Sequence, residues 1–358
     1  MRKHQVLSLL TVLLVVPCSF LIAESAEKVP RVEIVLFTPS DIEPPVDAEL
    51  RLKQLGSFTE QFFVKWLKKA GYPPVREQFF TRDDMNEIVV RRIKGDKTAA
   101  SGAYDKWGFA RSVRLKTEEQ YSLPDHGNMY WIFVWLGEDR EYKDWRGLGT
   151  PKGGGVCMVR YPKVPDPLVT KTYIHELGHV FSLPHIGPLK KQREDVSLMG
   201  PNLINYRKLI KKPYRTYYMT PAASAMIWKH PVFTGTVEQR GSMPKQLELS
   251  AYQAKFDLRK KEITITGKIR SDMPCHSVVL VDQSQGAPGP YWYKSYVSRV
   301  ASDGSFKITV SEPIPRSGIF KLLPCFENGI NTGNKTTNGL QSAISKPYTW
   351  NGKKFIFR

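Results

Sequence analysis

Three histidines and one glutamate lie close together in one short stretch of the chain. His175 and His179 are four residues apart, and Glu176 directly follows the first of them. On a helix this spacing places both imidazoles on one face, one turn apart, where they can bind one zinc ion. His185 comes six residues after His179 and follows Pro184, a residue that ends helices and restricts the backbone. If the chain turns back here, His185 supplies a third nitrogen, so the sequence predicts a three-histidine zinc site.

The same residues predict that the metal is catalytic. Three imidazoles leave one tetrahedral position of zinc open, and a water bound there has a pKa of roughly 7. Glu176 lies to the side of the metal, where it can take a proton from that water and pass it to a leaving amine. Because only seven of the 358 residues are histidines, chance would produce this spacing with a probability on the order of 10⁻⁴. We therefore interpret the stretch as the active site of a zinc hydrolase.

The pattern HExxH with a third histidine six residues later resembles the metzincin clan of zinc peptidases, whose motif is HExxHxxGxxH. The clan also has a methionine in a tight turn beneath the metal, and Met199 in Ser197-Leu-Met-Gly200 is the candidate here. The resemblance covers roughly residues 29–233. It implies a peptidase with Zn²⁺ as its cofactor, His175, His179 and His185 as ligands, and Glu176 as the catalytic base.

The sequence departs from the clan's pattern at two positions. Ser182 replaces the glycine that lets the chain turn sharply after the helix. Pro201 occupies the position, two residues after the methionine, where some subgroups have a functional tyrosine, so that role is not transferred. An alternative ligand scheme, as in gluzincins, would use Glu194 or Asp195 in place of His185. Both lie in a short polar stretch without a clear helix to present them.

The first two thirds of the chain predict an α/β (α+β) catalytic domain over residues 29–240, with a mixed twisted sheet and three main helices. Apolar runs predict buried strands, and helical spacing of Leu, Phe and Trp predicts a long helix. Asp166-Pro167 and Thr220-Pro221 are helix starts. Strands are predicted at 31–37, 75–80, 88–93, 129–136 and 153–159, and helices at 48–70, from 166, and at 222–229.

Residues 245–358 change to short alternating strands separated by Gly, Pro, Asn and Asp, which predicts an all-β sandwich of the immunoglobulin-like kind. The expected strands are 263–269, 277–281, 291–299, 306–310 and 318–323. Cys275 and Cys325 both fall in this domain and could pair as a disulfide, with free thiols as the alternative. Cys157 is expected to be a buried small hydrophobe.

Residues 1–26 resemble a signal peptide: Arg2 and Lys3 precede an apolar run that ends in small residues. We therefore expect a secreted or periplasmic protein, with an uncleaved anchor as the alternative. No later segment is apolar enough to span a membrane. The formal charge of +19 suits an acidic polysaccharide or cell-surface polymer, or else reflects only a solvated basic surface. Nucleic acid is not expected as a partner.

These observations favour a secreted zinc-dependent endopeptidase that acts on protein or peptide. One alternative is a non-catalytic, zinc-containing binding module for acidic polysaccharide or a cell surface. Glu176 argues against it, since a module that only binds needs no base beside the metal. Another is a zinc amidase that acts on cell-wall peptides with the same four residues. Trp292 and Tyr293 could stack on sugar rings, although aromatic strand residues more often belong to a core.

Overall fold

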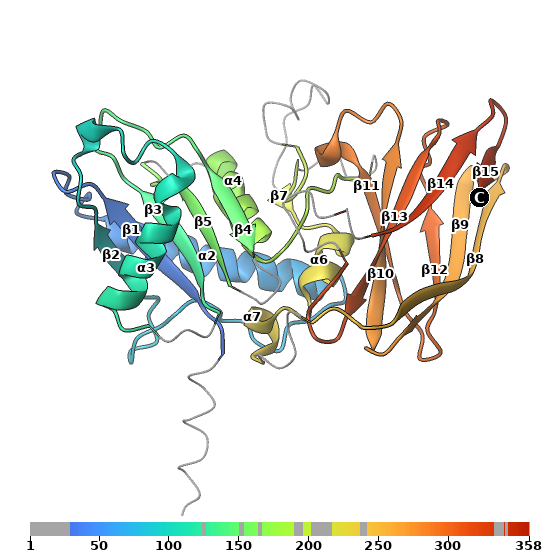
Figure 1. Ribbon diagram of the computed structural model, residues 1–358, viewed down its shortest axis with the longest axis horizontal. Coiled ribbons are helices and arrows are strands. Elements are labelled where there is room, and N and C mark those ends of the chain that lie inside the picture. Colours follow the sequence, from blue (N-terminus) through green and yellow to red (C-terminus); the bar gives the residue numbers. More distant parts are fainter. Residues whose placement is uncertain are drawn as a thin grey trace, which may run out of the picture.

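The computed structural model describes residues 29–123, 127–149, 154–163, 167–189, 196–201, 217–236, 242–332, 340 and 343–357. The expected signal peptide, Glu194 and Asp195 lie outside these residues. Within the described residues, no helix is both long enough and apolar enough to cross a bilayer. We call residues 29–236 the N-terminal unit and residues 242–357 the C-terminal unit (Figure 1).

The N-terminal unit is a mixed α/β structure built on one five-stranded sheet. The strand order is β2-β1-β3-β5-β4, in which the first four strands are parallel and the edge strand β4 is antiparallel to β5. The strands are β1 (Val32–Thr38), β2 (Val90–Lys94), β3 (Met129–Val134), β4 (Arg146–Gly149) and β5 (Gly155–Arg160). Its helices are α2 (Ala48–Lys69), α3 (Ala110–Gln120), α4 (Pro167–Val180), α6 (Pro221–Ile227) and α7 (Pro231–Thr234).

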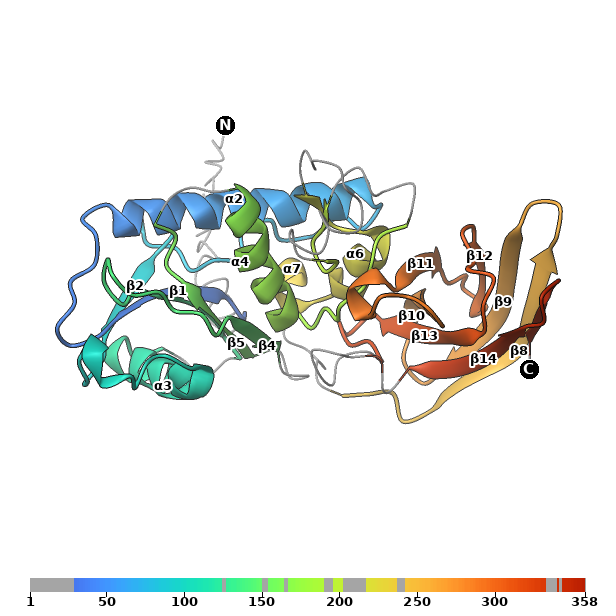
Figure 2. The same cartoon turned by 90° about the horizontal axis from the view of Figure 1, so that it is seen from above.

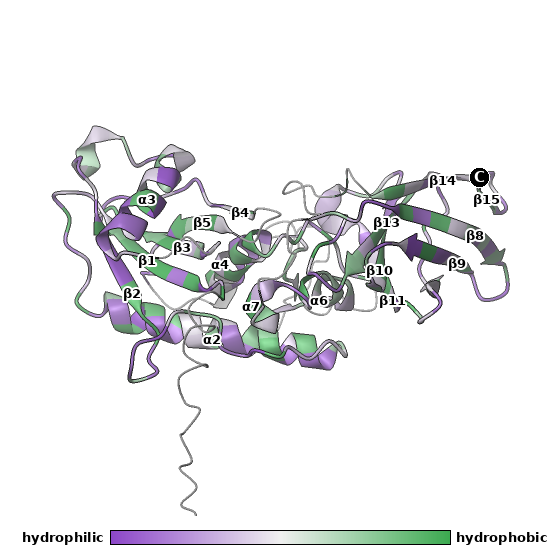
Figure 3. Cartoon of the chain, turned by 60° about the horizontal axis from the view of Figure 1, so that its bottom comes forward, coloured by the Kyte–Doolittle hydropathy of each residue, from purple (hydrophilic) through white to green (hydrophobic). Residues whose placement is uncertain are grey.

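Helices cover both faces of this sheet, which explains why β1 and β3 are buried along their whole length. Figure 2 shows α3 on one face and α2 with α4 on the other. Side chains alternate between the two cores: Ile34 and Trp131 pack toward α2 and α4, whereas Val35 and Ile132 pack toward α3. In Figure 3, β3 and β5 are mostly hydrophobic, whereas α2 alternates between hydrophobic and hydrophilic residues.

The predictions for this unit need two corrections. The described residues contain five α-helices, where three main ones were expected. Residues 75–80 form no regular strand, and only Phe80 makes an isolated bridge to Val32. The buried carboxylate of Glu60 explains this difference, because it accepts the backbone N–H groups of Phe79 and Phe80 at 2.8 and 3.0 Å. A side chain thus satisfies donors that a strand would have paired.

The C-terminal unit consists of two antiparallel sheets, of order β11-β10-β13-β14-β15 and β12-β9-β8, which share one hydrophobic core. Its strands are β8 (Leu247–Asp257), β9 (Glu262–Ser271), β10 (Cys275–Ser284), β11 (Lys294–Arg299), β12 (Ser305–Val310), β13 (Gly318–Phe326), β14 (Ile344–Trp350) and β15 (Phe355–Phe357). The predicted strand at 291–299 begins later, because residues 290–292 form the short 3₁₀ helix η4 (Pro290–Trp292). The immunoglobulin-like assignment stays a prediction.

The two units are joined by a continuous core. Val279, Leu323 and Trp292 of the C-terminal unit belong to the same buried cluster as Ile186 and Phe233 of the N-terminal unit. Polar contacts reinforce this junction. The Arg299 guanidinium lies 3.8 Å from the ring centroid of Tyr72 and 4.4 Å from that of Trp228, and it donates to Gly71 O at 2.5 Å.

The three cysteines in the described residues are all free. Cys157 is buried on β5, as expected. Cys275 and Cys325, for which a disulfide and free thiols were both possible, lie on the neighbouring strands β10 and β13 as free thiols. A register shift in β10 places Cys275 opposite Phe326 and Ser277 opposite Cys325, so the two cysteines do not face each other in the ladder. Each thiol donates to a backbone carbonyl, Cys275 to Ser277 O and Cys325 to Leu323 O.

Candidate metal centre and active site

Helix α4 carries the first two histidines on one face, and the chain beyond it returns the third. The ring centroids of His175 and His179 are 4.7 Å apart, and those of His179 and His185 are 4.6 Å apart. One ring nitrogen of each histidine lies within 4.8 Å of the other two. His175 and His179 are buried and His185 is half-buried. The spacing-based prediction of three convergent imidazoles therefore agrees with the geometry.

The end of α4 directs His185 back toward the helix. Leu183 N–H bonds to Gly178 O at 3.0 Å and Ser182 N–H to His179 O at 2.9 Å, the two hydrogen bonds of a Schellman motif. Ser182 is the left-handed residue of this motif, with φ of +69°. The position thus requires a conformation that glycine adopts most easily, and here a serine adopts it.

Met199 lies against helix α4 at Gly178, the residue before His179. It is buried within the turn 197–200, which Gly200 N–H closes by bonding to Ser197 O at 3.1 Å. A Cβ at Gly178 would lie only 2.8 Å from the Met199 sulfur, so the helix and this turn are in close contact. Ile186 N–H also bonds to Met199 O at 3.2 Å, which joins the segment after His185 to the same turn.

Backbone carbonyls set the protonation of two imidazoles. The Nδ1 of His175 lies 2.7 Å from Leu198 O, and the Nδ1 of His179 lies 2.7 Å from Leu183 O. Because a carbonyl only accepts, both Nδ1 atoms carry hydrogen and both Nε2 atoms keep a lone pair. Burial lowers the pKa of His179 to about 4 and of His185 to about 3, and it holds that of His175 well below its usual value. All three rings are therefore neutral at pH 7.

This donor set fits a metal ion. The Nε2 atoms of His179 and His185 are 3.0 Å apart, and lone pairs that face one another at this distance need a cation or a proton between them. Two ligands of a tetrahedral zinc ion, each 2.0–2.1 Å from it, are about 3.3 Å apart. The carbonyl partners at Nδ1 are the outer contacts that orient metal-binding histidines.

Glu176 lies beside this centre with a perturbed pKa. Burial raises the pKa of its carboxyl group to about 7, while a hydrogen bond from Gly147 N–H and the charge of Lys171 oppose that rise. Gly147 belongs to the edge strand β4. A Cβ at this position would lie 1.8 Å from Glu176 O, so only glycine lets the strand approach the helix so closely. A carboxyl group with a pKa near 7 can both accept and release a proton at neutral pH.

Lys171, one turn before His175 on α4, was not recognised in the sequence. Its side chain is fully buried, and its Nζ donates to Gly200 O at 3.2 Å and Pro201 O at 3.4 Å. Burial lowers the pKa of this lysine to about 7. The sequence does contain a clue: Lys171 lies four residues before His175, and therefore on the same face of a mostly apolar helix. Lys171 ties α4 to the segment that follows Met199.

Comparisons with known proteins give a fold neighbour for this arrangement. No protein-family model matches the chain, and no curated protein does. Solved structures of OgpA from Akkermansia muciniphila match over both units. The fold resembles that of OgpA. A catalytically inactive OgpA in complex with an O-glycopeptide (glycodrosocin) substrate matches at 19% identity and a TM-score of 0.68, covering 93% of this chain and 96% of that chain. Wild-type OgpA matches in two crystal forms, at 20% and 19% identity, each with a TM-score of 0.68 and 96% of its chain covered; the matches span 92% and 93% of this chain.

At this identity the likeness to OgpA shows a shared fold, and it includes the C-terminal unit. That unit supplies an aromatic residue at the histidines. The ring centroid of Tyr291, in η4, lies 4.0 Å from that of His185 and 6.2 Å from that of His175. Burial and the charge of Glu176 raise the pKa of the Tyr291 hydroxyl. The sequence had suggested Trp292 and Tyr293, not Tyr291, as residues that could stack on sugar rings. Trp292 proves to be buried in the shared core.

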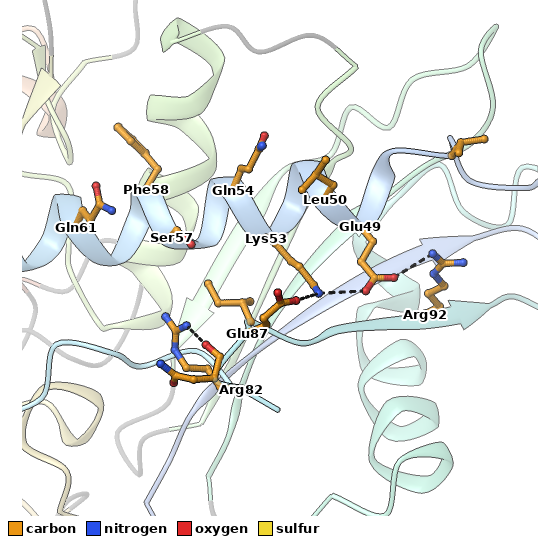
Figure 4. A pocket seen from close by; sticks show the side chains of 13 residues that line it. Glu49, Leu50, Lys53, Gln54, Ser57, Phe58, Gln61, Arg82, Glu87 and Arg92 are labelled. Carbon is orange, nitrogen blue, oxygen red and sulfur yellow. Dashed lines mark hydrogen bonds and ion pairs between the residues drawn. The ribbon is translucent and has the colours of Figure 1, made fainter. Parts of the chain in front are cut away.

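A separate groove runs along the outer face of α2 and is not lined by the histidines (Figure 4). Its charged side chains pair with one another: Lys53 contacts Glu87 at 2.8 Å, and Arg92 contacts Glu49 at 3.1 Å. Because these charges are already neutralised, the groove offers weaker chemistry than the histidine cluster, which remains the candidate site.

Proposed function

We propose that this protein is an exported, zinc-dependent peptidase with His175, His179 and His185 as the metal ligands. The observation that carries the proposal is the convergence of three neutral imidazoles beside one half-buried carboxyl group. A structural zinc site is closed by four protein ligands, whereas three ligands leave a position for substrate or water. A module that only binds a ligand has no need of Glu176 in this place.

The residues of the site then have distinct roles. The three imidazoles would hold a zinc ion, which would supply a Lewis acid for the peptide carbonyl and lower the pKa of a water molecule. Glu176 takes a proton from the attacking water at its carboxylate and delivers it to the nitrogen of the leaving amine. Met199 provides an apolar floor below His175 and His179, and Lys171 holds the turn that contains it.

The rest of the architecture is proposed on the same basis. We propose a metzincin-like catalytic domain over residues 29–240 and an immunoglobulin-like β-sandwich over 245–358, following an N-terminal signal peptide. As substrate we propose a peptide, with O-glycopeptides as the first class to test, because a solved structure of the fold neighbour OgpA holds an O-glycopeptide substrate.

Exchanging the base for its neutral amide tests this proposal. Glu176→Gln keeps the size of the side chain but removes the proton acceptor, so we expect a loss of kcat of at least about 10³-fold, within the range for a general base, with unchanged zinc content. The measurement is hydrolysis of a library of peptides and O-glycopeptides, followed by mass spectrometry, with metal analysis of the same samples.

Glu77→Gln is the matched control, since Glu77 is an exposed carboxylate that forms an ion pair with the exposed Lys68. It should retain wild-type turnover. Equal turnover in wild type and Glu176→Gln would remove Glu176 from the mechanism. Absence of cleavage of every library member by zinc-loaded wild type would contradict the peptidase assignment itself.

A further inference from the structure

Tyr291 contacts the histidines from the C-terminal unit, and the backbone next to it packs against the N-terminal unit. Gly187, two residues after His185, donates its N–H to Tyr293 O at 2.7 Å. A Cβ at Gly187 would lie 2.6 Å from Tyr291 O and from the Cα of Trp292. Trp292 is itself buried in the core that both units share. The loop that carries Tyr291 is therefore anchored to the N-terminal unit directly after this residue.

The ring of Tyr291 supports the one imidazole that lacks a carbonyl partner. His175 and His179 each donate from Nδ1 to a backbone carbonyl. For His185, the described residues include no hydrogen bond at Nδ1, and its ring instead packs against Tyr291 with the planes 36° apart. Outer contacts of this kind orient metal ligands, and removing one typically weakens metal binding 10–100-fold.

The hydroxyl of Tyr291 is available to a ligand. Tyr291 is half-buried, and within the described part of the chain its Oη has no hydrogen-bond partner. A phenol that packs against a ligand histidine and has no protein partner can donate to a substrate oxygen, where negative charge develops during attack on a carbonyl.

We propose that Tyr291 belongs to the active site, with its ring seating His185 and its hydroxyl hydrogen-bonding the substrate carbonyl beside Glu176. This proposal rests on the peptidase function proposed above. It makes the C-terminal unit a part of the catalytic apparatus, because the N-terminal unit alone would lack both the aromatic support of His185 and this donor.

Two substitutions separate the roles of ring and hydroxyl. Tyr291→Phe keeps the ring, so zinc affinity should stay at the wild-type value while kcat falls about 10²-fold, as for the loss of one donor to a developing oxyanion; KM should change little. Tyr291→Ala also removes the ring, and zinc affinity should then fall at least about tenfold. Zinc affinity is measured by competition with a chromogenic chelator, and kcat on a peptide that wild type cleaves.

Tyr293→Phe is the matched control, because it removes a half-buried hydroxyl two residues away in the same loop. It should leave both quantities unchanged, and melting temperatures would verify folding of all variants. Wild-type kcat in Tyr291→Phe would overturn the proposal, and so would unchanged zinc affinity in Tyr291→Ala. If wild type binds zinc but cleaves no peptide, the proposed function fails, while the zinc affinity of Tyr291→Ala still decides whether the ring seats His185.

Discussion

The carbonyl oxygens of Leu198 and Leu183 determine which ring nitrogen of His175 and His179 carries hydrogen. By accepting from Nδ1 they leave each Nε2 with a lone pair, and the Nε2 of His179 lies 3.0 Å from the Nε2 of His185. The sequence predicted which residues meet, because the spacing of His175 and His179 on a helix is fixed by the helix geometry. It could not predict the carbonyl partners, since they come from loops whose path depends on packing.

Ser182 is the residue whose conformation carries the clearest cost. Its φ of +69° is unfavourable for a side chain with a Cβ, and its buried Oγ has no partner among the described residues. We expect Ser182→Gly to raise the free energy of unfolding by about 1 kcal/mol, after allowing for the greater freedom of glycine in the unfolded chain. Urea unfolding measures this, and kcat should not change.

Ser57→Gly provides the contrast, because Ser57 lies inside the right-handed helix α2. There glycine should lower the free energy of unfolding by about 0.5 kcal/mol. If Ser182→Gly also destabilised the protein, the left-handed turn would not be the strained position that the structure indicates.

At the scale of elements, α4 and the edge strand β4 position the site together. α4 was predictable from its motif and from the apolar positions Ile174 and Leu177. β4 was not, because Arg-Gly-Leu-Gly has little strand propensity. The glycines of β4 let this strand approach helix α4 closely, because a Cβ at Gly149 would lie 2.3 Å from Val180 O. Only the structure shows that this strand lies against the helix.

The residue pattern of each segment also explains which of the other strands could be predicted from the sequence. β1 and β3 were predicted because strands buried on both faces are continuously apolar. β8 and β14 were missed. Their residues alternate between half-buried and exposed, and Pro347 interrupts β14. Tyr291 was assigned to a strand, because aromatic residues next to β11 look like strand residues until the short helix η4 is seen.

At the scale of the whole molecule, the two units pack against each other through a common core. Gly187 is one point at which the backbones of the two units approach closely. We expect Gly187→Ala to push the Tyr291 loop away from the histidines, because the added Cβ would meet backbone atoms at 2.6 Å that cannot yield as side chains do. The free energy of unfolding should fall by about 1–3 kcal/mol, as for other overpacked sites. The value of kcat should fall at least about tenfold, because Tyr291 would be displaced from the site.

Gly108→Ala is the matched control for this substitution, since a Cβ there would meet nothing within 4 Å. Both variants should be compared with wild type by thermal unfolding and by peptide hydrolysis. Gly187→Ala with wild-type stability and turnover would mean that the junction between the units does not hold the site.

We propose above all that three imidazoles hold one metal ion and that this ion makes the protein a peptidase. Titration of zinc into metal-free protein, with hydrolysis of a cleavable peptide followed at each step, tests it most directly. We predict no hydrolysis before zinc is added and a linear rise that ends at one zinc per chain. Hydrolysis by the metal-free protein, or full binding of one zinc without hydrolysis of any peptide in the library, would contradict the claim.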